Sequence, residues 1–156
     1  MKLDNVGYKL ISTFEGLRLT PYLCSAGVPT IGYGNTFYPN GAKVTMRDKK
    51  ITADYAFEIF VFIADLFAKD VSGLIKSQVN QNQFNALVSF AYNVGTDIDM
   101  DLIAEGLGDS TLLKKVNKNP NDPLIRNEFL KWNKANRKVL NGLTKRRKAE
   151  ADLYFS

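Results

Sequence analysis

The sequence has 156 residues, 45% of them hydrophobic, and a formal net charge of +5. A chain of this length suits one domain that buries a core of its own. It contains no histidine and a single cysteine, Cys24. These counts exclude Ser-His and Cys-His nucleophile pairs in their usual form, the common hydrolytic zinc sites and an internal disulfide. We expect no metal ion and no cofactor, so any catalysis must use carboxylates, hydroxyl groups or the one thiol.

Apolar residues at three- and four-residue steps predict a first helix over residues 3–15, which Gly16 ends. Residues 17–45 are rich in proline and glycine between short apolar runs, so they predict a small sheet of short strands. Within this region, Pro39-Asn40-Gly41 has the composition of a turn.

A long apolar helix is predicted after the sheet. Thr52 is its expected N-cap, and residues 53–66 are apolar on most sides, as expected for a buried helix that joins two lobes. Further predicted helices span residues 83–94, 110–116, 122–132 and 143–155. Gly95 ends the first of these, and Asp109 or Ser110 caps the second.

Membrane segments are not expected. Residues 1–8 lack the basic and apolar pattern of a secretory signal. The longest apolar run, residues 59–68, is about half a membrane span and contains Asp65. We expect a soluble monomer that is made in the cytoplasm and has no stable membrane association.

The positive charge points to an anionic partner, or else to a merely solubilising surface. Every charged residue between Glu128 and Glu150 is basic. Nucleic acid is a weak candidate partner, because these residues spread over two predicted helices without a recognised binding motif. We therefore expect no nucleic-acid binding.

Glu15 is the carboxylate with the most suggestive position. It follows Phe14 on an apolar face at the end of a predicted helix, where the helix dipole disfavours negative charge. A carboxylic acid in such a place can serve as a proton donor. An ordinary helix-end glutamate fits the same pattern, so position alone does not assign a role.

Two long segments resemble the phage-type lysozyme (endolysin) family, glycoside hydrolase family 24. The first runs from Phe14-Glu15-Gly16-Leu17-Arg18-Leu19 to Gly32-Tyr33-Gly34-Asn35-Thr36, and the second is residues 83–95. The family motif is Glu, eight residues, Asp or Cys, five residues, Thr, and Glu15, Cys24 and Thr30 match it. Shorter similarities at residues 110–115, 128–132 and 142–150 extend the resemblance over nearly the whole chain.

The resemblance implies an α+β, lysozyme-like fold in a single domain of residues 1–156. A small N-terminal β lobe, about residues 17–50, is expected to be joined by a long helix to a larger helical lobe. That lobe takes about residues 70–156 and the N-terminal helix, with a cleft between the lobes. Residues 96–109 carry more acid and more length than the usual family connection, and we expect a loop or short helix at the cleft edge.

The implied activity is that of a muramidase, which hydrolyses the β-1,4 bond between N-acetylmuramic acid and N-acetylglucosamine in peptidoglycan, for bacterial cell lysis. Glu15 is then the general acid, and Cys24 and Thr30 position or activate the attacking water. The positions expected to contact sugar are Thr36, Tyr92, Asn93 and Ser110. Arg146 and Arg137 are the candidate partners of Glu15, although Arg146 also has Glu150 one turn away.

Cys24 leaves the outcome open, because aspartate is the commoner residue at its position in the family. The thiol either takes part in water activation, or is passive while Glu15 and Thr30 act, or marks a lytic transglycosylase in which a sugar hydroxyl attacks. A non-catalytic module that binds wall glycan is a further alternative. The family also implies that a separate membrane-permeabilising protein releases the enzyme from the host cytoplasm to the periplasm or wall.

Overall fold

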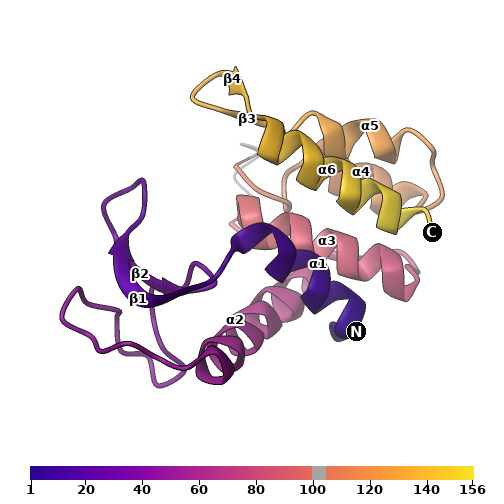
Figure 1. The fold of residues 1–156 in the computed structure, drawn as a ribbon. Coiled ribbons are helices and arrows are strands. Elements are labelled where there is room, and N and C mark those ends of the chain that lie inside the picture. Colours follow the sequence, from indigo (N-terminus) through magenta and orange to yellow (C-terminus); the bar gives the residue numbers. More distant parts are fainter. Residues whose placement is uncertain (100–104) are drawn as a thin grey trace.

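The structure is a computed structural model that describes residues 1–99 and 105–156. Its helices are α1 (Asn5–Glu15), α2 (Ala53–Leu74), α3 (Gln81–Val94), α4 (Thr111–Lys118), α5 (Ile125–Leu130) and α6 (Asn141–Tyr154). Its strands are β1 (Arg18–Leu23), β2 (Pro29–Gly32), β3 (Lys134–Ala135) and β4 (Lys138–Val139). Figure 1 shows a small β region beside a larger body of helices, with α2 leading from one to the other. The predicted α+β class is confirmed.

The β region is a two-stranded antiparallel sheet. Tyr22 pairs with Thr30 and Leu23 with Pro29, and the register shifts between Arg18 and Tyr22. The predicted turn at residues 39–41 is present, since the Gly41 amide donates to the Tyr38 carbonyl oxygen at 2.9 Å. The sequence therefore predicted the sheet and its turn correctly.

Helix α2 begins where expected, with the Thr52 hydroxyl accepting from the Tyr55 amide at 3.1 Å. It continues to Leu74, two turns beyond the predicted end. The extension is explained by Ala68 and Val71, which keep the buried face apolar although charged residues lie between them.

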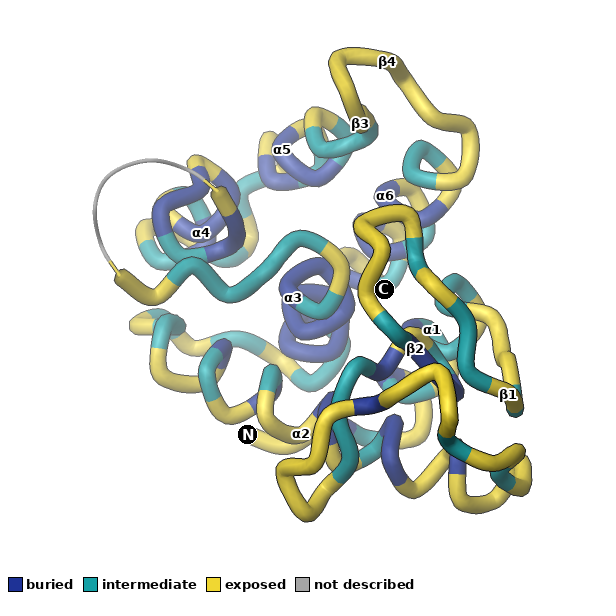
Figure 2. Tube along the Cα trace, turned by 90° about the vertical axis from the view of Figure 1, so that its left-hand side faces the viewer, coloured by how far each residue is buried: buried dark blue, intermediate teal, exposed yellow. Residues whose placement is uncertain are grey.

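Helix α3 is the centre of the helical body, and every residue from Gln83 to Ala91 is buried. Helices α1, α2 and α6 pack around it, as the end-on view of Figure 2 shows. Asn80 caps α3 in a capping box with Gln83, and Gly95 ends the helix as predicted. None of the described helices has the length and hydropathy needed to cross a membrane.

The C-terminal region differs from the prediction at two places. Helix α5 is shorter than expected, because residues 123–124 form a turn in which Asp122 Oδ1 accepts from the Leu124 amide at 2.9 Å. The β3–β4 hairpin was not predicted. Its two central residues, Asn136 and Arg137, have positive φ angles of 49° and 64°, a conformation in which glycine is the usual signal.

Candidate active site

Glu15 lies between the helical body and the β region. It is the last residue of α1, and Gly16, with φ of 69°, turns the chain into β1. Its side chain is 19% exposed, and Oε1 accepts a hydrogen bond of 2.6 Å from Arg146 Nη1. On the other side, a Cβ atom on Gly34 would lie 3.5 Å from Oε2. The carboxylate is thus held on one side and approached by the loop after β2 on the other.

Arg146 joins Glu15 to a buried ion network. Its Nε donates to Glu150 Oε1 at 3.0 Å, and its Nη2 donates to the Ser89 carbonyl oxygen at 3.1 Å. The Ser89 hydroxyl also donates to Glu150 Oε1 at 2.8 Å. Arg147 Nη1 lies 3.3 Å from the other Glu150 oxygen, so two guanidinium groups and two carboxylates balance in charge.

Of the two arginines considered as partners of Glu15, the structure assigns Arg146. The alternative, Arg137, is wrong, because it is exposed in the β3–β4 turn and forms no ion pair with a described residue. The second sequence-based option for Arg146, a pair with Glu150, is also present. Arg146 therefore bonds both acids at once.

Cys24 and Thr30 lie together at the end of the β1–β2 sheet where a turn joins the two strands. The Cys24 amide donates to the Val28 carbonyl oxygen at 3.1 Å, and the Thr30 hydroxyl donates to the same oxygen at 2.8 Å. Hydrogen bonds to the thiolate from the backbone at Val28 and Ala26, and from the Thr30 side chain, lower the pKa of Cys24. The thiolate is therefore more available than in an ordinary cysteine.

Tyr22 connects the thiol to the carboxylate electrostatically. Burial raises the pKa of Tyr22, Arg18 opposes this, and the charges of Cys24 and Glu15 raise it further. The Arg18 guanidinium carbon lies 4.5 Å from the centre of the tyrosine ring. Both candidate catalytic groups thus act on one side chain, although no described hydrogen bond joins them directly.

Tyr92 and Thr36 lie near the same region. The Tyr92 hydroxyl accepts from Asn35 Nδ2 at 3.2 Å and lies 3.4 Å from the Tyr33 carbonyl oxygen, so it links α3 to the β region. Burial and the negative charge of Glu15 raise the pKa of Tyr92 above its ordinary value. Thr36 is half-buried and borders a hollow of about 380 Å³ in the β region.

The two remaining predicted sugar contacts differ from each other. Asn93 is exposed at the end of α3, and its Oδ1 accepts from Arg147 Nη2 at 2.6 Å. Ser110 is fully buried, donates to the Leu107 carbonyl oxygen at 2.6 Å and accepts from the Leu113 amide at 3.0 Å. The expectation that Ser110 lines the cleft is therefore corrected, because its hydroxyl is used to cap α4.

Sequence analysis missed three contributors to this site. Arg147 lies directly after Arg146 on α6, Asn35 reaches Tyr92, and Gly34 allows the loop to approach Glu15. A signal existed for Gly34 and Asn35, since both lie within the matched family segment. No periodicity in the sequence marks Arg147, because a run of basic residues normally forms a solvated helix face.

An acidic cluster lies apart from these residues. One carboxylate oxygen each from Asp97, Asp99 and Asp109 lie within 4.8 Å of one another. Asp97 Oδ2 already accepts from the backbone amides of Glu105, Gly106 and Asp109 at 3.1–3.3 Å. These hydrogen bonds give Asp97 a structural role, since they join it to residues 105–109. The loop or short helix expected within residues 96–109 falls partly on residues 100–104, which lie outside the described residues.

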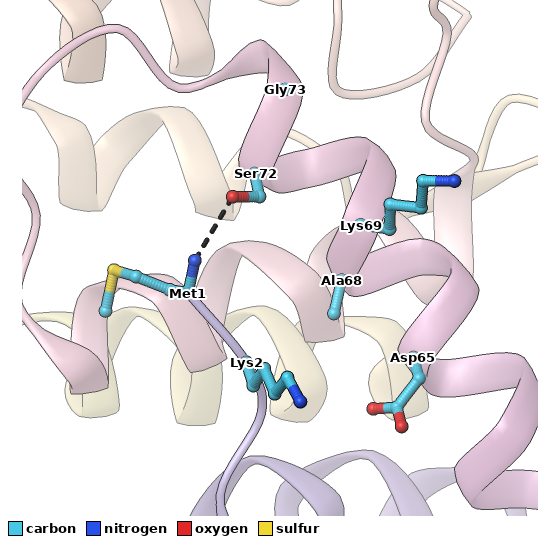
Figure 3. Close-up of a pocket in the computed structure, with 7 residues that line it drawn as sticks. All are labelled: Met1, Lys2, Asp65, Ala68, Lys69, Ser72 and Gly73. Carbon is cyan, nitrogen blue, oxygen red and sulfur yellow. Dashed lines mark hydrogen bonds between the residues drawn. The ribbon is translucent and has the colours of Figure 1, made fainter.

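A separate pocket of about 430 Å³ is formed where the first residues of the chain meet α2 (Figure 3). The Met1 amino group donates to Ser72 Oγ at 3.2 Å, and Asp65 lies at the pocket edge with Lys2 and Lys69. None of its lining residues belongs to the candidate active site.

The chain is similar in sequence to phage lysozymes and endolysins. The model of the phage lysozyme family matches residues 12–150. The chain is 38% identical to an endolysin of Bacillus phage B103 over its whole length, which is 55% of that relative, so it spans just over half of it. It is 36% identical to an endolysin of Acyrthosiphon pisum secondary endosymbiont phage 1, of which it covers 99%.

The fold also matches a solved structure, an endolysin from Escherichia coli O157:H7 phage FAHEc1. The TM-score is 0.86 at 38% identity, over all of this chain and 94% of the other. Two more distant relatives, from Haemophilus phage HP1 and Bacteriophage PS119, are named SAR-endolysins. The family model and the whole-chain similarity together show that the chain belongs to the phage lysozyme family.

Proposed function

We propose that this chain cleaves peptidoglycan, as a muramidase that hydrolyses the β-1,4 bond between N-acetylmuramic acid and N-acetylglucosamine. The observation that carries the proposal is Glu15, a partly exposed carboxylate that Arg146 fixes at the end of α1, directly before the β1–β2 hairpin that carries Cys24 and Thr30. Glycoside hydrolysis needs such an acid on one side of the bond and a group that serves the nucleophile on the other.

In the proposed mechanism, the hydrogen bond between Glu15 and Arg146 decides which carboxyl oxygen delivers the proton. Arginine only donates, so Oε1, which accepts from Arg146 Nη1, is not the protonated oxygen. The acidic proton belongs on Oε2, the oxygen on the Gly34 side. From there it passes to the glycosidic oxygen as the bond to the sugar breaks.

Water then attacks the anomeric carbon from the opposite face. In the proposed step the Cys24 thiolate accepts a proton from this water, and the Thr30 hydroxyl, which donates its own proton to the Val28 carbonyl oxygen, accepts a hydrogen bond from the same water. The water oxygen bonds to carbon, so the sugar gains a hydroxyl group with inverted configuration. No covalent sugar–enzyme intermediate forms in this scheme.

The test is Glu15→Gln, which retains a hydrogen bond acceptor for Arg146 but has no proton to give. We expect loss of lysis of purified peptidoglycan by at least a hundredfold, in line with the usual contribution of a general acid. Glu58→Gln, at an exposed position of α2, is the matched control and keeps full activity. Glu15→Gln with wild-type activity would reject the proposal.

Cys24 favours one second candidate, a lytic transglycosylase, because a thiol is a weaker match to water activation than the commoner aspartate. Mass spectrometry of the digested glycan separates the two reactions. Reducing muramic acid ends indicate hydrolysis, and anhydro ends indicate transglycosylation. Binding of walls without any new ends would instead identify a glycan-binding module.

The partner in this proposal is bacterial peptidoglycan, with the enzyme acting as a monomer. Release from the host cytoplasm through a separate membrane-permeabilising protein is part of the same proposal. The relatives named SAR-endolysins make release the point to test directly, by expressing this chain with and without such a protein and measuring lysis.

A further inference from the structure

Arg147 is buried without the hydrogen bonds that a buried guanidinium normally makes. The side chain has no exposed surface, and its Nε and Nη1 have no hydrogen bond partner. Nη1 lies 3.3 Å from Glu150 Oε2, close enough for an ion pair but not aligned for a hydrogen bond. Among the described residues its one hydrogen bond goes from Nη2 to Asn93 Oδ1, at 2.6 Å.

Stability does not explain this arrangement. A guanidinium has five N–H donors, and burial with most of them unused costs free energy that an apolar side chain of similar size would not. The ring of Phe90, 4.8 Å from the guanidinium carbon, recovers part of that cost. Burial lowers the pKa of Arg147 to about 10, so the group keeps its charge at neutral pH. Arg147 is therefore a buried, charged side chain whose one well-formed hydrogen bond goes to the exposed residue Asn93.

That bond fixes the orientation of the Asn93 amide. Arginine has no acceptor, so the carbonyl oxygen of Asn93 must face Arg147 and the Nδ2 amino group must face away. Nδ2 makes no hydrogen bond to any described residue. Asn93 is exposed and borders a pocket of about 490 Å³ that Trp132 and Leu143 also line. Arg147 also pairs with Glu150, which shares Arg146 with Glu15, so Asn93 is joined to the candidate active site through this ion network.

We propose that Arg147 is a positioning residue that holds Asn93 Nδ2 toward the substrate, where it donates to an amide carbonyl oxygen. The inference rests on the proposed function, since it assigns a substrate contact to the same site. Peptidoglycan offers such oxygens in two places, the N-acetyl groups of the sugars and the peptide attached to muramic acid. Arg147 touches no substrate itself and acts only through Asn93.

The first test separates donor from acceptor at Asn93. Asn93→Asp keeps an oxygen for Arg147 but replaces the outward N–H donor with an acceptor. We expect KM for soluble peptidoglycan fragments to rise roughly three- to tenfold, the worth of one hydrogen bond, with kcat little changed. Asn93→Ala should show a similar rise. Wild-type KM in both variants would overturn the proposed contact.

The second test asks whether Arg147 acts through Asn93. Arg147→Lys keeps a positive charge near Glu150 but loses the planar group that reaches Asn93. We expect it to raise KM, and to raise it no further when Asn93 is already alanine. Equal effects in both backgrounds would show that Arg147 does not work through Asn93 and would overturn the proposal. Arg126→Lys, in the exposed pair with Asp152, is the matched control with unchanged KM.

Folding and function are kept apart by measuring thermal unfolding of each variant, and by fragment binding in the Glu15→Gln background. If Arg147→Lys does not fold, the Asn93 variants still test the substrate contact that the proposal requires, because Asn93 is exposed, and wild-type KM in both would overturn it. Chitin oligosaccharides carry N-acetyl groups without peptide, so a KM effect on them assigns the contact to the N-acetyl group. An effect confined to peptide-bearing fragments assigns it to the peptide.

The failure of the proposed function and the failure of this inference give different results. A wild-type chain that neither binds nor cleaves glycan rejects both. Normal cleavage by every Asn93 variant rejects the inference alone.

Discussion

At the scale of single residues, the proposed reaction depends on the state of the Cys24 thiol. Its thiolate is stabilised by backbone groups at Val28 and Ala26 and by Thr30, all on the β1–β2 hairpin. The same hairpin therefore positions the sulfur and lowers the pH at which it ionises. A thiolate at this position could therefore serve as the base in the proposed step, in place of a carboxylate.

We expect Cys24→Ala to reduce lysis well below wild type and Cys24→Asp to retain it. The pH dependence gives a sharper result. A thiolate base is present above the thiol pKa and is lost as the pH falls through it, so the acid limb of the wild-type profile follows Cys24. Because an aspartate ionises near pH 4, Cys24→Asp should move that limb to lower pH.

Cys24→Ser is the size-matched control, since serine does not ionise in the working range. Turbidity loss of bacterial walls at a series of pH values measures all four proteins. Equal activity of the alanine variant, or an acid limb that stays in place in Cys24→Asp, would show that the thiol is passive.

Some roles of the site residues can be predicted from the sequence, and others cannot. The spacing of Glu15, Cys24 and Thr30 predicts a joint role that stays a proposal, whereas the predicted pairing of Arg146 with Glu15 is present in the structure. The role of Ser110 was misjudged, because a helix cap and a sugar contact use the same hydroxyl group and look alike in a sequence. Arg147 was missed because its burial depends on α3, which is far away along the chain.

At the scale of elements, the contact of α1 with α3 holds Glu15 against the helical body. Gly7 is a point of close approach between the two helices. A Cβ atom at this position would lie 2.5 Å from a Leu3 methyl carbon and 2.7 Å from Asn85 Oδ1. Asn85 also donates to the N-cap of α1, Asp4 Oδ1, at 2.8 Å, so one buried amide joins both helices.

We expect Gly7→Ala to lower the free energy of unfolding by about 1–3 kcal/mol, because the added methyl group separates α1 from α3. Gly73→Ala is the matched control in α2, where no atom lies within 4 Å of the added Cβ. That change should stabilise by about 0.5–1 kcal/mol through the helix preference of alanine. Urea unfolding measures both, and a Gly7→Ala variant as stable as wild type would contradict the close approach.

Prediction of elements succeeded where local chemistry is strong and failed where packing decides. Thr52, Gly16 and Gly95 mark helix ends through their own backbone and side-chain properties, and all three were identified correctly. The end of α2 was placed too early because charged residues interrupt the apolar run there. The β3–β4 hairpin lacks a glycine in its turn and has two residues in each strand, so little local signal marks it.

At the scale of the whole molecule, positive charge is concentrated in one stretch of the chain. The basic stretch between Glu128 and Glu150 includes the β3–β4 hairpin, whose residues 134–140 are all exposed. In Figure 1 this hairpin projects from the helical body near the start of α6. Lys134 also lines the pocket that Asn93 borders, which connects the charge to the proposed substrate site.

We expect the double variant Lys134→Glu and Lys138→Glu to act more slowly on intact walls, because it removes the attraction for an anionic polymer beside the site. Its activity should also depend less on salt than that of the wild type, because it has lost the electrostatic attraction that salt screens.

The control is the double variant Lys49→Glu and Lys50→Glu, on exposed residues before α2, which makes the same change in net charge at a different place. Rates on intact walls and on uncharged chitin oligosaccharides, measured from low to high ionic strength, compare the two. If both double variants lose activity equally, net charge alone governs encounter with the wall and the position of the hairpin has no part in it. A loss confined to the hairpin variant, and absent on the uncharged substrate, places the electrostatic contact beside Asn93.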